Sequence, residues 1–301
     1  MSKFISGLLL KRIVEKYNID LIHANSEAAG IVAVKTRNKY KLDIPIVYTA
    51  HGVLPAKVKD IINQVDKIIA VSEFSRKSAI KEGFLAEKIQ VIYNGVDTDK
   101  FKPNRQNKNL LRKKYNIPQE AFTMIIVSRI KNLRNKGHQH LLDVLKIYEV
   151  SKKWHLVVIG KGKGFSDLKK KIKEYHLQDR VHLLGHKTDV ENYIDIADVM
   201  VLPSYFETFG LVLAEGMAMQ KPAIAFNVGG ISEVISDKET GFLVKYNDDD
   251  DLVNKINRLA QDKDLCNKMG INARKKVEKD FANQIMIKKL IEVYVSIKNS
   301  G

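Results

Sequence analysis

The chain has 301 residues, of which 45% are hydrophobic and 29% are charged, so it is long enough and apolar enough to form two globular domains. Its single cysteine, Cys266, excludes an internal disulfide and suits a reducing compartment, and no apolar run approaches the ~20 residues that cross a membrane. The net charge of +16 is spread over both halves without a basic stripe or interleaved aromatic residues. This pattern argues against nucleic acid as a partner and favours an anionic membrane surface instead.

The first half alternates short apolar strands with helices. We expect strands at residues 20–23, 45–49, 66–71 and 89–93, and helices at 3–17, 28–37 and 73–83. His51 follows the second strand directly, at the edge where α/β sheets bind ligands, so it is a candidate site residue. The alternative is a strand-end histidine that is satisfied by its own backbone. His23, in the first strand, is more typical of a packing residue. The polar stretch from about 97 to 109 contains Pro103 and indicates a linker between domains.

The second half repeats the alternation. We expect strands at residues 123–127, 156–159, 181–184, 199–202, 223–226 and 242–244, with helices between them and a helical tail from 249 onward that breaks near 280. Strands that alternate with helices predict doubly wound parallel sheets. The acidic run Asp248–Asp251 invites a metal-site interpretation, but it precedes a helical pattern. An N-cap followed by acidic residues in the first helical turn explains it better.

The stretch from Val199 to Pro222 carries the strongest local signal. A short apolar strand ends at Pro203, and a buried helix is expected from about Phe209. The turn between them lies at the carboxyl end of the strand. The first helical N–H groups, expected from Phe209, Gly210 and Leu211, have no partners inside the helix and would attract an anion. Gly210 lacks a Cβ, so that a phosphate could approach the backbone closely.

Two carboxylates flank this predicted anion site. Glu207 lies in the turn and Glu215 lies eight residues later, inside an otherwise apolar helix where an acid is costly unless a polar group meets it. For one glutamate alone, a backbone N–H or a lysine is an equally good partner. Both together suit a ligand with hydroxyl groups at its two ends and phosphates between them. A nucleotide-sugar is such a ligand.

The segments Glu207-Thr208-Phe209-Gly210 and Ala214-Glu215-Gly216 resemble the E-x7-E motif of retaining glycosyltransferases of glycosyltransferase family 4. The resemblance covers nearly the whole chain except the start of the family pattern. It implies the α/β GT-B fold, in which two Rossmann-like domains face each other across a cleft. It further implies a first, acceptor-side domain with linker over residues 1–104, truncated at its N-terminus, a nucleotide-sugar-binding domain over 105–280, and a last helix over 281–301 that packs on the first domain.

The same resemblance implies roles for individual residues. Glu207 holds the sugar hydroxyls and Glu215 the ribose hydroxyls, while Arg129, Lys136 and the 209–211 amides hold the diphosphate. The remaining candidates are His51 in the T-A-H-G context as the cleft histidine, Thr208 beside Glu207, and Gly160, Gly162, Gly229 and Gly230 in two glycine-rich turns near the donor. The glycine turns alone are weak evidence, because they lack G-x-G-x-x-G spacing.

The chain departs from the family pattern in the loop that carries Arg129 and Lys136. Ser128 stands where a glycine is usual, and the loop is two residues longer. Lys131 and Arg134 therefore compete with Lys136, which we favour because Gly137 follows it. A surface ion pair for Arg129 and a solvated loop lysine for Lys136 are the structural alternatives. We find no Asp-x-Asp at a strand end, so we expect cations rather than a metal to stabilise the leaving diphosphate, and no cofactor.

The expected function is transfer of a hexose from a UDP- or GDP-sugar to a glycan or glycolipid acceptor, with retention of configuration and without a strong general base. The expected location is the cytoplasm, with peripheral contact at the inner membrane face. The rival interpretation is a catalytically impaired fragment or subunit that binds nucleotide-sugar or a partner chain. It draws on the missing start of the first domain, which would leave strand 20–23 as an uncovered edge and weaken transfer by this chain alone.

Overall fold

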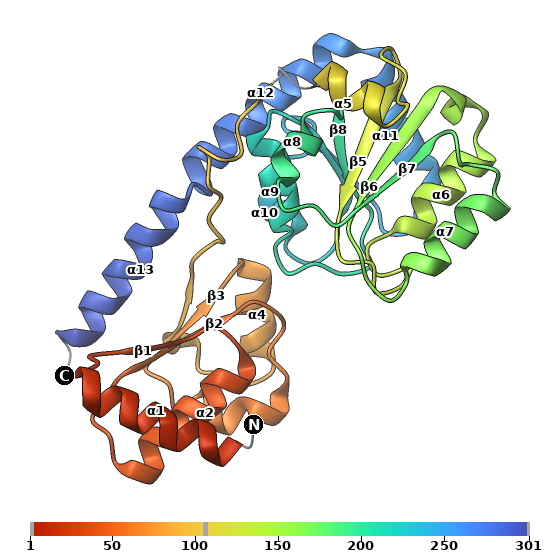
Figure 1. Ribbon diagram of the computed structural model, residues 1–301. Helices are drawn as coiled ribbons and strands as arrows, with labels where there is room; N and C mark the ends of the chain where they lie inside the picture. Colours follow the sequence, from red (N-terminus) through yellow and green to blue (C-terminus); the bar gives the residue numbers. More distant parts are fainter. Residues whose placement is uncertain (1–2, 105–107, 300–301) are drawn as a thin grey trace. The chain divides into compact units, whose positions relative to one another are not determined.

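The stretches expected as strands all form parallel strands in the computed structural model, which describes residues 3–104 and 108–299 (Figure 1). The chain divides into two units, one made of Met1–Gly95 with Gln284–Gly301 and the other of Val96–Asn283. The sequence places these boundaries near 104 and 280. The stretch after Gly95 belongs to the second unit because Val96 N donates to Phe281 O at 2.7 Å and Asn283 N donates to Val96 O at 2.9 Å.

The first unit is built on a four-stranded parallel sheet in the order β1-β2-β3-β4. The strands are β1 (Ile22–Ala24), β2 (Ile46–Ala50), β3 (Lys67–Ala70) and β4 (Ile89–Val91). The helices are α1 (Lys3–Tyr17), α2 (Glu27–Tyr40), α3 (Lys59–Ile62), α4 (Glu73–Lys81) and α13 (Asn283–Lys298), with short 3-10 helices at Ala56–Val58 and Ala86–Lys88. Within residues 3–104 and 108–299, β1 pairs with β2 alone, so it is an edge strand of this sheet.

The two faces of this sheet are covered by different parts of the chain. Ile46 and Tyr48 of β2 point to the face that α2, α3 and α4 cover, whereas Val47, between them, points to the opposite face, as the two-residue period of a strand requires. On that opposite face Val47 packs with Ile69, Ile92 and Val293. The tail helix α13 therefore completes the core of the first unit, although about 190 residues separate it from β4 in the sequence.

The second unit is built on a six-stranded parallel sheet in the order β10-β9-β8-β5-β6-β7. The strands are β5 (Phe122–Val127), β6 (Trp154–Ile159), β7 (Val181–Gly185), β8 (Val199–Leu202), β9 (Ala223–Phe226) and β10 (Gly241–Val244). The helices are α5 (Lys108–Lys114), α6 (His138–Ile147), α7 (Phe165–Glu174), α8 (Val190–Ile194), α9 (Leu211–Ala218), α10 (Ile231–Val234), α11 (Asp249–Gln261) and α12 (Lys263–Asp280), with a 3-10 helix at Glu149–Lys153.

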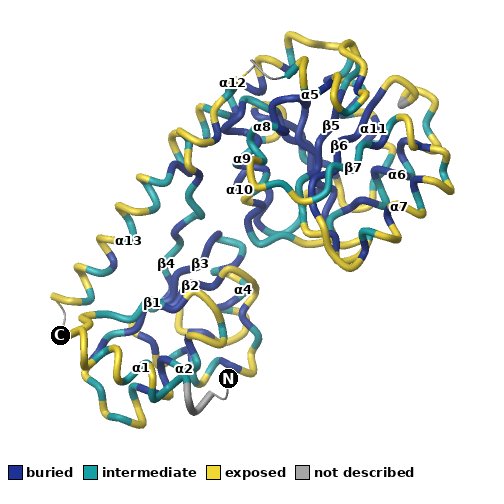
Figure 2. The backbone as a smooth tube through the Cα atoms, in the orientation of Figure 1, coloured by how far each residue is buried: buried dark blue, intermediate teal, exposed yellow. Residues whose placement is uncertain are grey.

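The strand order of this sheet reverses at β5, which lies between β6 and β8. Open α/β sheets bind ligands outside the carboxyl ends of the strands at such a switch point. Every residue of β6, β8 and β9 is buried, as Figure 2 shows by the dark centre of this unit. The strands are therefore a rigid base, and the loops that follow β5 and β8 stand side by side on it.

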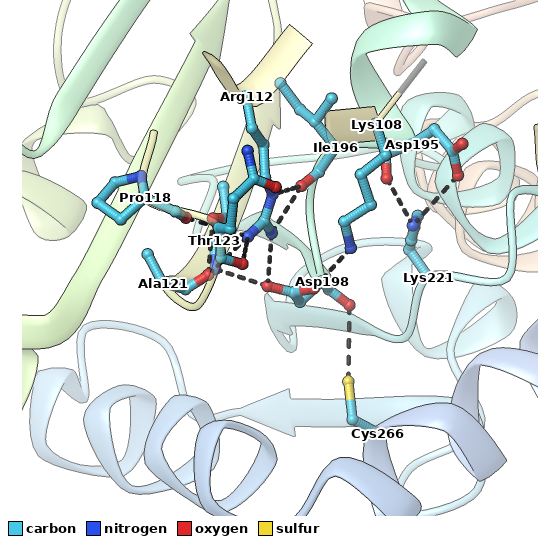
Figure 3. A network of polar contacts seen from close by, with 11 residues as sticks. Lys108, Arg112, Pro118, Ala121, Thr123, Asp195, Ile196, Asp198, Lys221 and Cys266 are labelled. Atoms are coloured by element: carbon cyan, nitrogen blue, oxygen red, sulfur yellow. Dashed lines mark hydrogen bonds and ion pairs between the residues drawn. The ribbon is translucent and has the colours of Figure 1, made fainter. Parts of the chain in front are cut away.

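A buried polar network lies at the other edge of the same sheet, at the amino ends of β5 and β8 (Figure 3). Arg112 of α5, which is 2% exposed, donates to the backbone carbonyl of Ile196 and to Asp198 Oδ2 at 3.1 Å. Asp198 in turn accepts from Thr123 N at 2.8 Å. Because the network lies at the edge opposite the switch point, it holds α5 and the strand ends in place and is not a candidate site.

The acidic run at Asp248 caps a helix, as expected from its position. Asp248 Oδ1 accepts from Asp251 N at 2.9 Å at the start of α11, and the next acids lie in the first helical turn. Among the described residues, no group of three or more histidine, cysteine, aspartate and glutamate side chains is placed to hold a metal ion.

Candidate active site

The candidate site lies at the switch point of the second unit, in the loops that follow β5 and β8. Lys136 in the first loop and Glu207 in the second form an ion pair, with 2.5 Å between Lys136 Nζ and Glu207 Oε1. The Glu207 side chain is mostly buried, and Ser204 Oγ donates to the same carboxylate oxygen at 3.0 Å. A cation and an anion from the loops after two different strands therefore meet at the switch point, where sheets of this kind bind ligands.

Glycines let the neighbouring loops approach one another backbone to backbone. A Cβ on Gly160 would lie 1.9 Å from Ser128 O, and one on Gly162 would lie 2.3 Å from Ile130 O. Gly229 has a φ of +57°, and a Cβ there would lie 1.7 Å from Glu207 O. The loops after β5, β6, β8 and β9 consequently form one connected rim.

Further contacts hold this rim at Glu207 and Lys136. Gly230 N donates to Glu207 O at 3.0 Å, so that the Gly229–Gly230 turn fixes the backbone of the glutamate. Gly137 has a φ of +79°, and a Cβ there would lie 2.0 Å from Pro203 O. The glycine after Lys136 thus packs against the end of β8, which places the lysine beside Glu207. Lys131 and Arg134, in the same loop, are exposed.

The helix that follows Glu207 begins later than expected. We expected helical N–H groups from Phe209, Gly210 and Leu211, but α9 begins at Leu211 and Gly210 is its N-cap, with left-handed backbone (φ 89°). A Cβ on Gly210 would lie 2.7 Å from Ile231 Cδ1, so only glycine fits this turn. Phe209 is buried and packs edge-to-face against Phe281, with 5.3 Å between ring centroids. The amides of Phe209 and Gly210 therefore precede the helix, and that part of the prediction was wrong.

Glu215 lies in α9 and is partly buried beside two charged residues that the sequence did not indicate. Burial raises the pKa of Glu215 to about 7, with Lys100 opposing the shift and Glu191 adding to it. Lys100 Nζ lies 3.7 Å from Glu191 Oε2. Lys100 belongs to the stretch interpreted as a turn and linker, so no signal in its own neighbourhood connected it with Glu215.

The remaining candidates fall into two places. Arg129 is exposed at the start of the loop after β5, and Thr208 lies between Glu207 and Phe209. His51 belongs to the first unit, where it follows β2. There His23 is a packing residue, as expected, with its ring nitrogens 2.7 Å from Thr49 Oγ1 and 2.5 Å from Tyr294 Oη. Burial, together with the neighbouring His51, lowers the pKa of His23.

Two family models match the chain and together cover most of it. The model described as glycosyl transferases group 1 matches residues 107–276, and the model described as glycosyltransferase family 4 matches residues 3–100. The first model contains all the candidate residues from Arg129 onward, and the second contains His51. The two matches meet close to the boundary between the two units.

The chain is similar to curated enzymes along nearly its whole length. N-acetyl-alpha-D-glucosaminyl L-malate synthase of Bacillus anthracis is 28% identical over 308 residues, which span 96% of this chain and 77% of that protein. UDP-Gal:alpha-D-GlcNAc-diphosphoundecaprenol alpha-1,3-galactosyltransferase of Escherichia coli is 27% identical, over 97% of this chain and 79% of that protein.

A solved structure of the Anabaena protein HepE, in complex with UDP and glucose, has the same architecture. It superposes with a TM-score of 0.87 at 25% identity, over 96% of this chain and 81% of that chain. The expected fold class, two parallel-sheet Rossmann-like domains of the GT-B type, is confirmed by this similarity and by the strand orders of the two sheets.

Proposed function

The chain belongs to the group 1 glycosyltransferases, and we propose that it transfers a hexose from a nucleotide-sugar to an acceptor hydroxyl with retention of configuration. The observation that carries the proposal is the Lys136–Glu207 pair at the switch point of the second unit. The pair combines an acceptor for sugar hydroxyls with a cation for a diphosphate, the two chemical groups that a nucleotide-sugar presents at its reacting bond.

We propose a UDP- or GDP-sugar as the donor. The HepE structure contains UDP and glucose, and the galactosyltransferase relative is named for UDP-Gal, which supports a nucleotide-sugar. In our proposal Glu207 accepts hydrogen bonds from the sugar hydroxyls and Glu215 accepts them from the ribose. The second glycine turn, Gly229–Gly230, holds Glu207 by its backbone.

The proposed reaction breaks the bond between the anomeric carbon and the diphosphate. Negative charge grows on the diphosphate as the bond breaks, so cations near it stabilise the transition state more than the ground state. Lys136 and Arg129 supply this charge without a metal ion. When the sugar hydroxyls form hydrogen bonds with the Glu207 carboxylate, Lys136 leaves that carboxylate and pairs with a phosphate oxygen of the donor instead. The acceptor hydroxyl attacks from the same face, and a leaving phosphate oxygen takes its proton.

The proposal is tested by comparing two lysines in one loop. Lys136→Ala should lower the rate of sugar transfer from UDP-sugars or GDP-sugars roughly 100-fold, the usual cost of removing one preorganised charge from a transition state. Lys131→Ala is the matched control, because Lys131 lies in the same loop and is exposed, and it should change the rate less than about twofold. Equal losses in both variants would remove Lys136 from the site.

Three further results bear on the same proposal. Turnover that persists in EDTA supports cations instead of a metal, and a strict need for Mg²⁺ or Mn²⁺ contradicts that part. A product with inverted configuration contradicts retention. Tight nucleotide-sugar binding without any transfer would favour a binding subunit over an enzyme.

We propose a glycan or glycolipid acceptor in cell-surface glycan synthesis and a cytoplasmic location with peripheral membrane contact. Among the described helices, none is both long and apolar enough to cross a bilayer. Residues 3–41 contain eight basic and three acidic residues, whereas residues 42–104 contain nine and eight. The positive charge of the first half is therefore concentrated on α1 and α2. On α1 the exposed side chains include Leu9 and Ile13 beside Arg12 and Lys16, a composition that suits the surface of an anionic bilayer.

Sedimentation with phospholipid vesicles tests this membrane contact. The chain should bind vesicles that contain phosphatidylglycerol and not vesicles of phosphatidylcholine alone, and high salt should weaken the binding. Replacing Leu9 and Ile13 by glutamine should weaken it about tenfold. The control replaces Ile287 and Ile291 of α13, which are equally exposed, and should leave binding unchanged. Equal binding to both vesicle types would contradict the proposal.

A further inference from the structure

Ser128 occupies a rigid position at the carboxyl end of β5, one residue before Arg129. Its backbone N–H donates to Ile159 O at 3.0 Å, and its carbonyl oxygen faces Gly160 so closely that a Cβ would lie 1.9 Å away. The backbone is therefore fixed from both sides by β6 and the turn after it. Such a backbone fixes the direction of the Cα–Cβ bond, which is useful for a side chain that must meet a ligand.

The partner of the Ser128 hydroxyl is an imidazole that has no other described partner. His138 begins α6 and is 1% exposed. Its Nε2 lies 3.3 Å from Ser128 Oγ, and its buried Nδ1 makes no hydrogen bond within the described residues. Burial, with a smaller effect of Lys136, lowers the pKa of His138 to about 4, so the ring is neutral at a pH of about 7. One ring nitrogen therefore carries a hydrogen and the other a lone pair.

The position of that hydrogen decides what Ser128 can do. A buried N–H without an acceptor is rarer in proteins than an under-used acceptor, which favours the tautomer with the hydrogen on Nε2. His138 Nε2 then donates to Ser128 Oγ, and the hydroxyl keeps its own hydrogen for another acceptor. Within the described residues no such acceptor is in contact with it. The flanking residues Arg129 and Lys136 are those that we assign to the diphosphate.

We propose that Ser128 is a further donor-binding residue, whose hydroxyl donates to a diphosphate oxygen of the nucleotide-sugar, and that His138 is a positioning residue that aims it. The inference rests on the proposed function, because it takes the loop after β5 as the diphosphate site. It assigns a purpose to the serine that stands where the family has a glycine. A hydroxyl there adds one donor to the diphosphate, to which we also assign Arg129 and Lys136 of the same loop.

The test measures binding of UDP and of uridine to the full chain by calorimetry. Ser128→Ala should weaken UDP binding about tenfold, the usual cost of losing a hydrogen bond to a charged group, and leave uridine binding unchanged. His138→Leu should weaken UDP binding by a similar factor in a chain that keeps Ser128. In a chain that already carries Ser128→Ala, it should have no further effect. His138→Gln, whose amide nitrogen can donate at the place of Nε2, should retain most of the affinity.

Each contrary result is distinct. If His138→Leu weakens UDP binding equally in both backgrounds, His138 acts through packing and not through Ser128. If Ser128→Ala weakens uridine as much as UDP, the hydroxyl does not meet the diphosphate. Should His138→Leu fail to fold, Ser128→Ala and His138→Gln still carry the comparison. If the unchanged chain binds neither UDP nor GDP, the proposed function itself fails.

Discussion

At the scale of single residues, the site depends on charges that are partly removed from water. Glu215 is an acid in an apolar helix, and its environment contains one cation, Lys100, and one further acid, Glu191. Burial outweighs the cation, so the pKa of Glu215 rises to about 7. A carboxyl group with this pKa changes its protonation near neutral pH.

The pH dependence of donor binding follows from this pKa. In the ribose-binding role that we propose for Glu215, only its ionised form accepts strong hydrogen bonds from both hydroxyls, so affinity for the donor nucleotide should rise about tenfold between about pH 6 and about pH 8. Glu215→Gln should abolish this dependence and weaken binding at the higher pH about 10- to 100-fold. Lys100→Met should move the midpoint to higher pH, because the cation favours the ionised form. Calorimetry across this range is the measurement, and an unchanged profile in Glu215→Gln would exclude Glu215.

The same group has an opposite effect on the stability of the free protein. Its pKa is about 7 in the folded state, against the ordinary glutamate value of 4.5. Between these two values the folded chain holds a proton that the unfolded chain has released, so this group lowers the free energy of unfolding as pH rises through that interval. Binding and stability therefore respond to pH in opposite directions at this residue.

At the scale of the secondary-structure elements, α5 is held to the sheet mainly by one side chain. Arg112 donates to the carbonyls of Pro118, Gln119, Ala121 and Ile196 and to the carboxylate of Asp198. Burying a guanidinium is costly unless its donors are used, and here they meet a ring of acceptors. The network holds the amino ends of β5 and β8 together. It thereby fixes the orientation of both strands, whose carboxyl ends lead into the loops of the site.

Removing this side chain should destabilise the second unit strongly. Arg112→Met leaves several carbonyls without their donor and removes one of the three described donors of the Asp198 carboxylate, and breaking such a buried network typically costs about 3–5 kcal/mol. A unit of this size should then melt roughly 6–20 °C lower. Lys108→Met is the control, since Lys108 also pairs with Asp198, at 3.2 Å, but is more exposed, and it should cost less than about 1 kcal/mol. Equal losses in thermal unfolding would show that the ion pair and not the carbonyl ring matters.

At the scale of the whole molecule, the chain crosses between its units twice, and the tail completes the core of the first. Val293 of α13 is 2% exposed and packs with Val47, Ile69 and Ile92 on one face of the first sheet. The first unit thus depends on residues at both ends of the chain. Its stability should respond to changes in α13, which follows the whole second unit in the sequence.

Two valines of the same helix provide the test. Val293→Ala should lower the free energy of unfolding of the first unit by about 2 kcal/mol, because it leaves a cavity in the core. Val295→Ala removes the same atoms from a side chain that is 53% exposed, and it should cost less than about 0.5 kcal/mol. Chemical denaturation followed by circular dichroism measures both. A similar cost for the two variants would show that α13 is not part of this core.

Much of the fold is encoded locally and could be predicted from the sequence. Runs such as Met200–Leu202 and Ile125–Val127 are apolar on both faces, as expected of strands buried in a parallel sheet, and all the predicted strands occur. The position of Glu207 in a turn at the carboxyl end of a strand could also be predicted, because the turn follows the apolar run of β8. Asp248 shows the same locality, because a cap depends on residues within one helical turn.

Other features depend on contacts between distant segments, and only the tertiary structure decided them. The sequence favours Lys136 over Lys131 because Gly137 follows it, but its pairing with Glu207 depends on the packing of Gly137 on Pro203, a contact across two loops that no local pattern encodes. Helix α9 begins at Leu211 because Gly210 has a left-handed backbone (φ 89°), in a turn where a Cβ would lie 2.7 Å from Ile231 Cδ1 of a different helix. The effect of Lys100 on Glu215 and the bond between Ser128 and His138 are of the same kind. Periodicity reports which face of an element is buried, whereas the neighbour on that face is chosen by the packing of the whole domain.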